Sequence, residues 1–185
     1  MRRVMVIGGP GAGKTTFARR LGELTGLPVT SLDRIYWLPD WTPRPAREGD
    51  RLAREAAAGE AWIIEGNYSA TFPERLKRVD TIVFLDFGTT MRLRRVVMRT
   101  LRHFGRVRPD MAEGCPERFD WGFLKWTANY RNNGRARAER MLATLPKHIR
   151  VVRLATPRDV RRFLDGCRDD MSSTEAAAAT RGEVS

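Results

Sequence analysis

The residues whose types and spacing best fit a chemical task are the glycines, lysine and threonine of residues 8–15. This segment, GGPGAGKT, satisfies the pattern G-x-x-x-x-G-K-[ST], in which backbone N–H groups surround nucleotide phosphates. Lys14 adds a full charge, the Thr15 hydroxyl can hold Mg²⁺, and the following helix presents its positive end. We therefore predict that a nucleoside triphosphate is bound by Gly8, Gly9, Pro10, Gly11, Ala12, Gly13, Lys14, Thr15 and Thr16.

The segments on either side of this motif strengthen the prediction. Residues 4–7 form an apolar run of the kind that fills a buried parallel strand. After the motif, Phe17, Leu21 and Leu24 recur at spacings of four and three, which indicates a helix over residues 15–24. The alternative is a chance glycine-rich turn, but strand, glycine loop and helix in this order is the arrangement that phosphate binding requires.

Composition limits the class of protein. The 185 residues fit one domain with a sizeable core, and 42% of them are hydrophobic. No apolar stretch reaches the length of a transmembrane helix, and no signal peptide is visible. Cys115 and Cys167 are far apart and form no C-x-x-C pair. These features predict a cytoplasmic protein with no membrane partner, no disulfide framework and no cysteine metal site.

The charge is strongly positive. Lys+Arg number 34 against 22 Asp+Glu, a formal net charge of +12, and only four of the basic residues are lysines. Arginine forks match phosphate oxygens, so this surface suits nucleotides and polyanions alike. The alternative is that the arginines serve solubility. We expect weak, non-specific nucleic-acid binding, since the sequence has no helix-turn-helix or zinc-finger pattern.

Strands and helices are expected to alternate along the chain, which predicts an α/β fold with a parallel sheet and helices on both faces. The expected strands are residues 4–7, 28–32, 61–64, 81–85 and 149–154. The expected helices after the first are residues 46–58, 90–104, 120–145 and one from residue 157 that ends near Gly166. Residues 37–45 are expected to form a loop, and residues beyond Asp169 a disordered tail.

Three acids stand at the ends of expected strands: Asp33, Glu65 and Asp86. The carboxyl ends of parallel strands share one edge with the phosphate loop, which is where ligands bind in such sheets. One of these acids could organise Mg²⁺ through water, and another could accept the proton of an attacking hydroxyl. The alternative for each is a solvated turn acid or a helix cap.

The helix expected over residues 90–104 carries two stripes. An apolar stripe, which we expect to be core, comprises Leu93, Val97, Leu101 and Phe104. An arginine stripe on the other side comprises Arg95, Arg99, Arg102 and Arg106, and it leads into a glycine-bounded basic loop that contains Arg108. The stripe could be merely solvated, but a mobile lid that brings arginines onto a transferring phosphate is favoured.

Aromatic residues gather in the loops expected near the acceptor side. Tyr36, Trp37 and Trp41 follow the second strand, and Tyr68 follows the third. They could form an apolar wall for a ring-shaped acceptor, or they could plug the edge of the core.

With these residues in hand, the chain resembles the adenylate-kinase-like small kinases of the P-loop superfamily, whose GxPGxGK[ST] form residues 8–15 match. More narrowly, it resembles the bacterial group labelled "DNA topology modulation protein" over residues 3–164. The matching segments are residues 8–15, 32–33, 37–41, 62–68, 106–110 and 114–118.

The resemblance implies a P-loop domain over residues 1–168 with a five-stranded parallel sheet of order 2-3-1-4-5, a lid over about residues 105–119, and a tail over residues 169–185. It implies that Arg95 and Arg99 contact ATP at the lid hinge and that Glu65 organises Mg²⁺ through water. Further phosphate contacts are implied on the return helix, at Arg131, Arg135 or Arg137, without a choice among them.

The chain also departs from the family. Ser69 replaces the arginine that grips the phosphate of AMP-type acceptors, whereas Asp33 stands where shikimate-, gluconate- and nucleoside-type kinases place an acid near the acceptor hydroxyl. The resemblance therefore implies an ATP- and Mg²⁺-dependent kinase whose acceptor is a small hydroxyl-bearing molecule, a nucleoside or another small metabolite. The alternatives are a nucleoside monophosphate kinase and an NTP-binding protein associated with DNA topology.

The residues expected to act are few. Those expected to promote phosphoryl transfer are Lys14, Asp33, Arg95, Arg99, Arg106 and Arg108. Those expected to hold the acceptor are Asp33, Trp37, Asn67 and Tyr68, and those expected at the metal are Thr15 and Glu65.

Overall fold

The computed structural model describes the backbone of residues 1–182 and the side chains of residues 1–171. Its centre is a five-stranded parallel sheet of order β2-β5-β1-β6-β7. The strands are β1 (Arg3–Gly8), β2 (Val29–Ser31), β5 (Trp62–Glu65), β6 (Thr81–Leu85) and β7 (Arg150–Leu154). The predicted fold class and the predicted strand order 2-3-1-4-5 are therefore confirmed.

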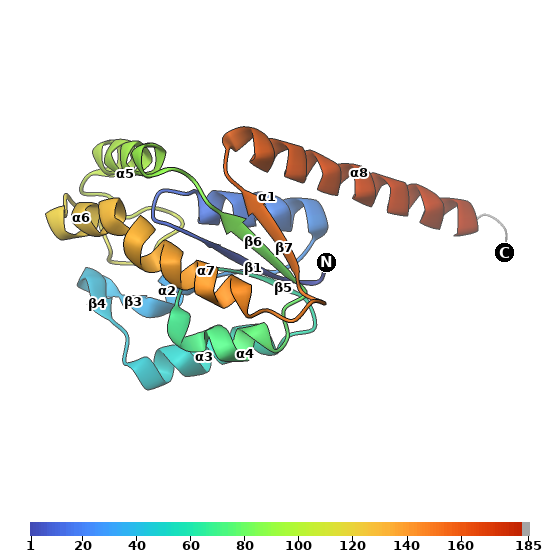
Figure 1. Cartoon of the computed structure of the whole chain (residues 1–185), viewed down its shortest axis with the longest axis horizontal. Coiled ribbons are helices and arrows are strands. Elements are labelled where there is room, and N and C mark those ends of the chain that lie inside the picture. Colours follow the sequence, from blue (N-terminus) through green and yellow to red (C-terminus); the bar gives the residue numbers. More distant parts are fainter. Residues whose placement is uncertain (183–185) are drawn as a thin grey trace.

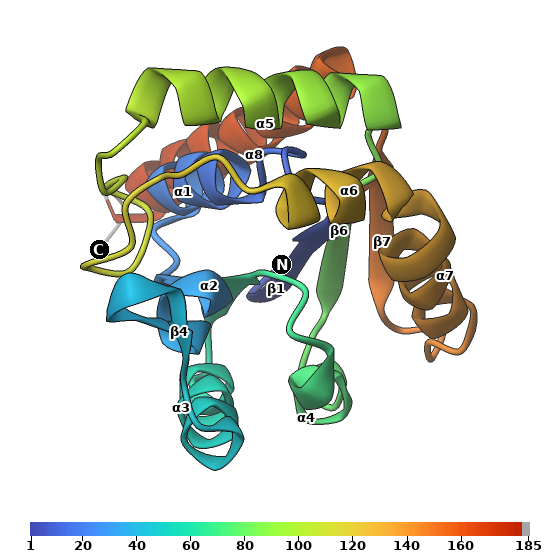
Figure 2. The same cartoon turned by 90° about the vertical axis from the view of Figure 1, so that its left-hand side faces the viewer.

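Helices cover both faces of this sheet (Figures 1 and 2). The helices of eight or more residues are α1 (Lys14–Thr25), α3 (Ala46–Ala58), α5 (Thr89–His103), α6 (Trp121–Asn129), α7 (Ala136–Ala143) and α8 (Pro157–Gly182). The short ones are α2 (Leu32–Tyr36) and α4 (Phe72–Leu76), and a π-helical segment, η3 (Arg131–Arg135), joins α6 to α7. The helix predicted over residues 120–145 is thus one helical run with an interruption.

The strands alternate their side chains between two cores, as a sheet buried on both faces requires. On one face Val4, Val6 and Val83 pack with Phe17 of α1 and Leu164 of α8. On the other face the core includes Met5, Ile7, Trp62, Ala53 of α3, Phe72 of α4 and Ala138 of α7. The carboxyl ends of the strands form one edge of the sheet, between the two helix-covered faces. Helices α5 and α6 lie past this edge (Figure 2).

Residues 37–43 form a small antiparallel hairpin where the sequence predicted only a loop. β3 (Trp37–Leu38) pairs with β4 (Thr42–Pro43), and a 3-10 turn, η1 (Pro39–Trp41), connects them. The hairpin packs on the predicted lid: Trp37 and Trp41 cover a cluster of Met111, Ala112 and Cys115. The prolines of this segment favoured a loop in the sequence analysis. The hairpin could not be predicted locally, because its packing contacts come from a distant segment of the chain.

The prediction that the apolar stripe of α5 is core is wrong. Leu101 and Phe104 are 63% and 64% exposed, whereas Arg92, Val96 and Thr100 are buried. Arg92 and Thr100 find hydrogen-bond acceptors inside the protein, so a polar face can be buried without leaving donors unpaired.

The last helix is longer than predicted. α8 continues through Gly166 to Gly182, so its backbone up to that residue is helical where we expected a disordered tail. One glycine inside a helix costs only about 1 kcal/mol relative to alanine, and the run of alanines at residues 176–179 has the highest helix propensity. Residues 183–185 of the predicted tail lie outside the described residues. Within the described residues, no helix has the length and apolar character to cross a membrane.

Candidate active site

A cavity of about 1070 Å³ lies along the carboxyl edge of the sheet. Residues from the phosphate loop, α2, the β3–β4 hairpin, α5, the lid, η3 and α8 line it. Of the residues predicted to act, this cavity brings together Pro10, Gly11, Ala12, Gly13, Lys14, Thr15, Thr16, Asp33, Trp37, Asn67, Tyr68, Arg95, Arg99 and Arg108.

The phosphate loop has the conformation that its glycines allow. Gly11 and Gly13 adopt left-handed φ angles of 73° and 89°, a region that favours glycine. Gly13 N-caps α1, whose first turn contains Lys14 and Thr15, so the free N–H groups and positive end of this helix face the cavity. The side chain of Asn67 fixes the start of the loop by donating to Gly8 O at 2.8 Å and accepting from Gly8 N at 3.1 Å.

Glu65 and Thr15 form the candidate metal site. Glu65 is fully buried, and its Oε1 accepts from Thr15 Oγ1 at 3.1 Å and from Ser31 Oγ at 2.5 Å. Its Oε2 is buried and has no hydrogen-bond partner among the described residues. Burial raises the pKa of the Glu65 carboxyl above its ordinary value of 4.5, Lys14 lowers that pKa, and Asp33 raises it.

These oxygens fit Mg²⁺, which takes oxygen ligands, commonly one or two carboxylates with phosphate and water oxygens. An orphaned carboxylate oxygen beside a threonine hydroxyl and an ammonium group is unfavourable in the empty protein. A divalent cation would satisfy it. No cluster of three or more His, Cys, Asp or Glu side chains with metal-binding geometry occurs among the described residues, so Thr15 and Glu65 would need ligands from nucleotide and water.

The other two strand-end acids have different surroundings. Asp33 is exposed, lies in the first turn of α2 and lines the cavity. Asp86 does not line it. Both Asp86 oxygens instead accept from Arg135, at 2.8 Å each, and Oδ2 also accepts from Arg153 at 3.1 Å. Asp86 therefore joins β6, η3 and β7 at the sheet edge, whereas Asp33 is the strand-end acid that lines the cavity.

Aromatic rings line one side of the cavity. Tyr36 contacts Trp37 and Tyr68, with ring centroids 4.8 and 5.5 Å away, and Trp37 contacts Trp41 at 5.5 Å. All four rings are half-buried, so they contribute to packing and still present surface to the cavity. The Tyr68 hydroxyl donates to Asp50 at 3.0 Å, which fixes its ring. These residues thus pack at the edge of the core, as one alternative predicted, and also line the cavity, as the other required.

The four predicted lid arginines occupy three kinds of position. Arg95 stacks on Phe87, 4.8 Å from the ring centroid, and donates to Ala12 O at 3.2 Å. Arg99 and Arg108 line the cavity but are ion-paired to Glu117, whereas Arg106 is exposed and does not line it. The geometry therefore associates Arg95 with the phosphate loop and leaves Arg106 outside the site.

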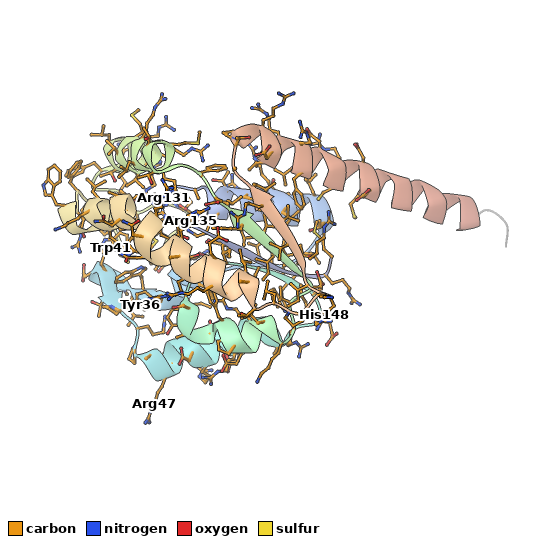
Figure 3. The ribbon with its side chains drawn as sticks, viewed as in Figure 1. Tyr36, Trp41, Arg47, Arg131, Arg135 and His148 are labelled. Atoms are coloured by element: carbon orange, nitrogen blue, oxygen red, sulfur yellow. The ribbon has the colours of Figure 1, made fainter. Side chains whose placement is uncertain are left out.

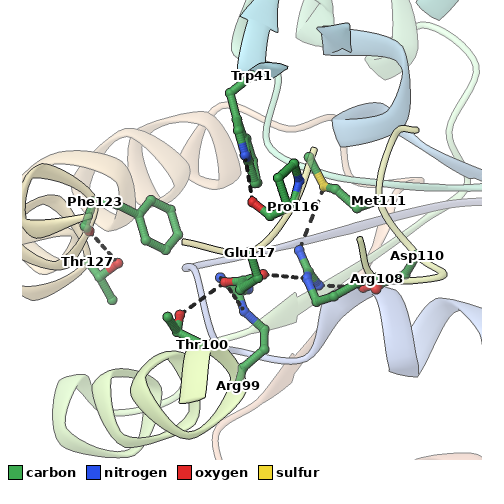
Figure 4. A network of polar contacts seen from close by, with 10 residues as sticks. All are labelled: Trp41, Arg99, Thr100, Arg108, Asp110, Met111, Pro116, Glu117, Phe123 and Thr127. Carbon is green, nitrogen blue, oxygen red and sulfur yellow. Dashed lines mark hydrogen bonds and ion pairs between the residues drawn. The ribbon is translucent and has the colours of Figure 1, made fainter. Parts of the chain in front are cut away.

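Glu117 is the centre of a polar network that holds the lid (Figure 4). Its carboxylate is 4% exposed and accepts from Arg99 Nε at 3.1 Å, Thr100 Oγ1 at 3.0 Å and Arg108 Nε at 2.7 Å. Arg108 also pairs with Asp110 at 2.8 Å. Burial and the neighbouring Arg108 lower the pKa of Arg99, while Glu117 raises it. Only the resemblance over residues 114–118 could have drawn attention to Glu117.

The return-helix arginines can now be told apart. Arg135 is bound by Asp86 and Glu139, and Arg131 is exposed and outside the cavity lining (Figure 3). Arg137 lines the cavity, and its Nη1 donates to Ser69 Oγ at 3.2 Å. Its guanidinium thus reaches Ser69, the position at which the resemblance implied the loss of an acceptor-binding arginine. Further cavity-lining residues that sequence reasoning missed include Phe87, Arg118, Phe123 and Trp126.

Comparison with solved structures supports the same fold class. A protein from Chloroflexus aurantiacus provisionally described as a kinase matches with a TM-score of 0.54 and 16% identity, covering 91% of this chain and 97% of that chain. A sugar kinase from Janibacter sp. matches with a TM-score of 0.47 and 16% identity, covering 94% and 93%. No protein-family model matches the chain, and no curated protein matches it. The match to the first of these structures supports the α/β fold described above, a parallel sheet flanked by helices.

Proposed function

We propose that this chain is an ATP- and Mg²⁺-dependent kinase that phosphorylates a hydroxyl group of a small acceptor. The observation that carries the proposal is one cavity lined by the phosphate loop and by an exposed carboxylate, Asp33, next to aromatic rings, with the buried carboxylate of Glu65 bonded to the cavity-lining Thr15. A nucleoside triphosphate and a ring-shaped acceptor need these features side by side.

Each residue has a defined task in this proposal. The loop amides and Lys14 bind the triphosphate, and Arg95 adds charge beside the loop. Bound Mg²⁺ would neutralise part of the phosphate charge, with Thr15 and Glu65 as its protein partners. Asp33 orients the acceptor hydroxyl and accepts its proton as that oxygen bonds to the γ-phosphorus and the bond to the β-phosphate oxygen breaks.

A phosphorylated acceptor is the second candidate, and Arg137 favours it. This arginine forms no ion pair with a described residue, and it reaches Ser69 on the side of the cavity where Tyr68 lies. A guanidinium there could bind an acceptor phosphate as a fork. A nucleoside monophosphate would then be phosphorylated on its phosphate, and Asp33 would be dispensable.

An acceptor screen tests the proposal. ADP formation from ATP is measured with nucleosides, sugars, small hydroxy acids and nucleoside monophosphates, and Lys14→Ala supplies the background. With the best acceptor, Asp33→Asn should lower turnover by a factor of about 10²–10⁴ and change ATP affinity only a few-fold, because a positioned base is lost. Asp40→Asn is the matched control, since Asp40 is exposed on the same segment but outside the cavity lining. Equal turnover of the Asp33 and Asp40 variants would contradict the role of Asp33.

A further inference from the structure

Arg92 is a buried arginine directly behind the phosphate loop. It lies in the first turns of α5 and is 2% exposed. Its three nitrogens donate to Phe87 O at 3.1 Å, Thr127 O at 3.2 Å and Thr89 Oγ1 at 3.2 Å. Every acceptor is therefore neutral, and the guanidinium is held by dipoles.

No carboxylate within the described part of the chain forms an ion pair with Arg92. Its guanidinium stacks on Tyr130, 4.8 Å from the ring centroid, and burial raises the pKa of Tyr130 to about 12, so this ring is neutral near pH 7. The acid that acts on Arg92 from farther away is Asp86. Asp86 is itself paired with Arg135 and Arg153, so it does not neutralise Arg92.

The guanidinium of Arg92 and the ring of Tyr130 lie against the loop at Gly9, and the backbone of Arg92 lies against it at Gly11. A methyl group added to Gly9 would lie 2.7 Å from Arg92 Nη1 and 2.9 Å from Tyr130 Cδ1. A methyl group on Gly11 would lie 2.4 Å from Arg92 O. The charge of Arg92 thus lies against the phosphate loop at Gly9, next to Pro10 and Gly11, which line the cavity.

We propose that Arg92 is a buried cation of the nucleotide site whose counter-charge is supplied by the bound phosphates. A buried charge without a partner is unfavourable, and an anion placed on the other side of one backbone layer relieves it. The interior screens this attraction less than water does. The inference rests on the proposed nucleotide binding, and it adds a residue that acts through the loop without touching the ligand.

The experiment compares affinities for AMP, ADP and ATP, measured by calorimetry without Mg²⁺, so that the net phosphate charge rises from AMP to ADP to ATP. Arg92→Met removes the charge and keeps approximately the length of the side chain. Arg92→Lys keeps the charge but loses the forked hydrogen-bond donors of the guanidinium group. Arg75→Met is the matched control. Arg75 is also fully buried, stacks on Phe72 at 4.8 Å and forms no ion pair with a described residue, but it lies in α4 and outside the cavity lining.

An electrostatic role predicts a graded loss. Arg92→Met should weaken ATP binding roughly tenfold, ADP binding less and AMP binding least, because the attraction grows with phosphate charge. Arg92→Lys should retain most of the ATP affinity, and Arg75→Met should leave the ratio of ATP to AMP affinity unchanged. If Arg92→Met does not fold, the ATP affinity of Arg92→Lys tests the proposal by itself. Retained affinity supports the proposal, and a tenfold loss of affinity overturns it.

The outcomes also separate this inference from the proposed function. A uniform loss for all three nucleotides in Arg92→Met, with wild-type protein binding normally, would show that Arg92 only packs the loop and would overturn the inference alone. A folded wild-type protein that binds none of the three nucleotides would overturn both.

Discussion

Glu65 illustrates how a residue of the proposed metal site can oppose folding. Its carboxylate is fully buried, and one of its oxygens has no partner among the described residues. Because burial disfavours the ionised form, the pKa of Glu65 in the folded chain lies above its ordinary value. A metal that binds the ionised carboxylate would offset this cost, so the empty protein carries an unfavourable interaction that its ligand relieves.

Replacing Glu65 by Gln should separate stability from activity. A raised folded pKa means that the contribution of Glu65 to stability is fully present below the unfolded pKa and is lost as pH rises through the folded pKa. Relative to wild type, Glu65→Gln should therefore gain stability as pH rises from about 4 to neutral. Its Mg²⁺-dependent turnover should fall by about 10² or more. Thermal unfolding across pH, without Mg²⁺, measures the first effect, and a difference that does not change with pH would contradict the argument.

At the scale of elements, the lid is held by charge pairing at one carboxylate. Glu117 binds Arg99 of α5 and Arg108 of the lid. In the backbone, Gly105 N donates to Glu117 O and Glu117 N donates to Arg106 O, both at 2.9 Å. Trp41 Nε1 donates to Pro116 O at 2.9 Å, so the same segment is tied to the hairpin. The segment predicted to be a lid is thus tied both to α5 and to the hairpin by hydrogen bonds and ion pairs.

Glu117→Gln tests the importance of this pairing. The variant keeps the shape but leaves two partly buried arginines next to each other without a carboxylate, a loss of roughly 2–3 kcal/mol, less than for a fully buried pair because Arg99 is 28% exposed. Amide hydrogen exchange over residues 104–119 should become faster, and the KM for ATP should rise. Glu113→Gln, an exposed lid acid, is the control. Unchanged exchange in the Glu117 variant would mean that the hairpin contacts alone hold the lid.

The contrast between α5 and the strands explains what could be predicted from sequence. The strands and the phosphate loop are local patterns, apolar runs and a spaced motif, so their residues identify them directly. In α5 two of the three buried positions are Arg92 and Thr100, which have acceptors in distant segments, while the apolar Leu101 is exposed. Periodicity cannot anticipate a buried arginine. The choice of Arg137 over Arg135 likewise depends on a π-helical segment and on Asp86, both visible only in three dimensions.

At the scale of the whole molecule, a net charge of +12 attracts polyanions whatever the function. Part of this charge lies away from the cavity: Arg94, Arg102 and Arg106 are exposed and do not line it. These residues are therefore available to DNA phosphates without involvement in nucleotide binding.

Filter binding of DNA beside a turnover assay separates a kinase from a nucleotide-switched DNA-binding protein. We expect retention at low salt that is independent of sequence and of ATP and that falls steeply as salt rises. We expect a variant in which Arg94, Arg102 and Arg106 are all changed to Ala to bind DNA with a weaker salt dependence. The slope of log affinity against log salt should fall by roughly one for each DNA phosphate that the variant no longer binds, and turnover should be unchanged. Tight binding at near-physiological salt that responds to ATP, with no turnover of any small acceptor, would favour the DNA-binding alternative.

The packing of the β3–β4 hairpin on the lid has a consequence for how such an enzyme could diversify. Trp37 and Trp41 belong at once to the acceptor wall and to the cluster of Met111, Ala112 and Cys115. Gly114 lies so close to Pro39 that a methyl group there would come within 2.8 Å of it. The two segments, some seventy residues apart in sequence, therefore pack as one unit. Under the proposed function, a lid transplanted from another protein would have to bring its own hairpin, and a change of acceptor made in the hairpin would have to be matched in the lid.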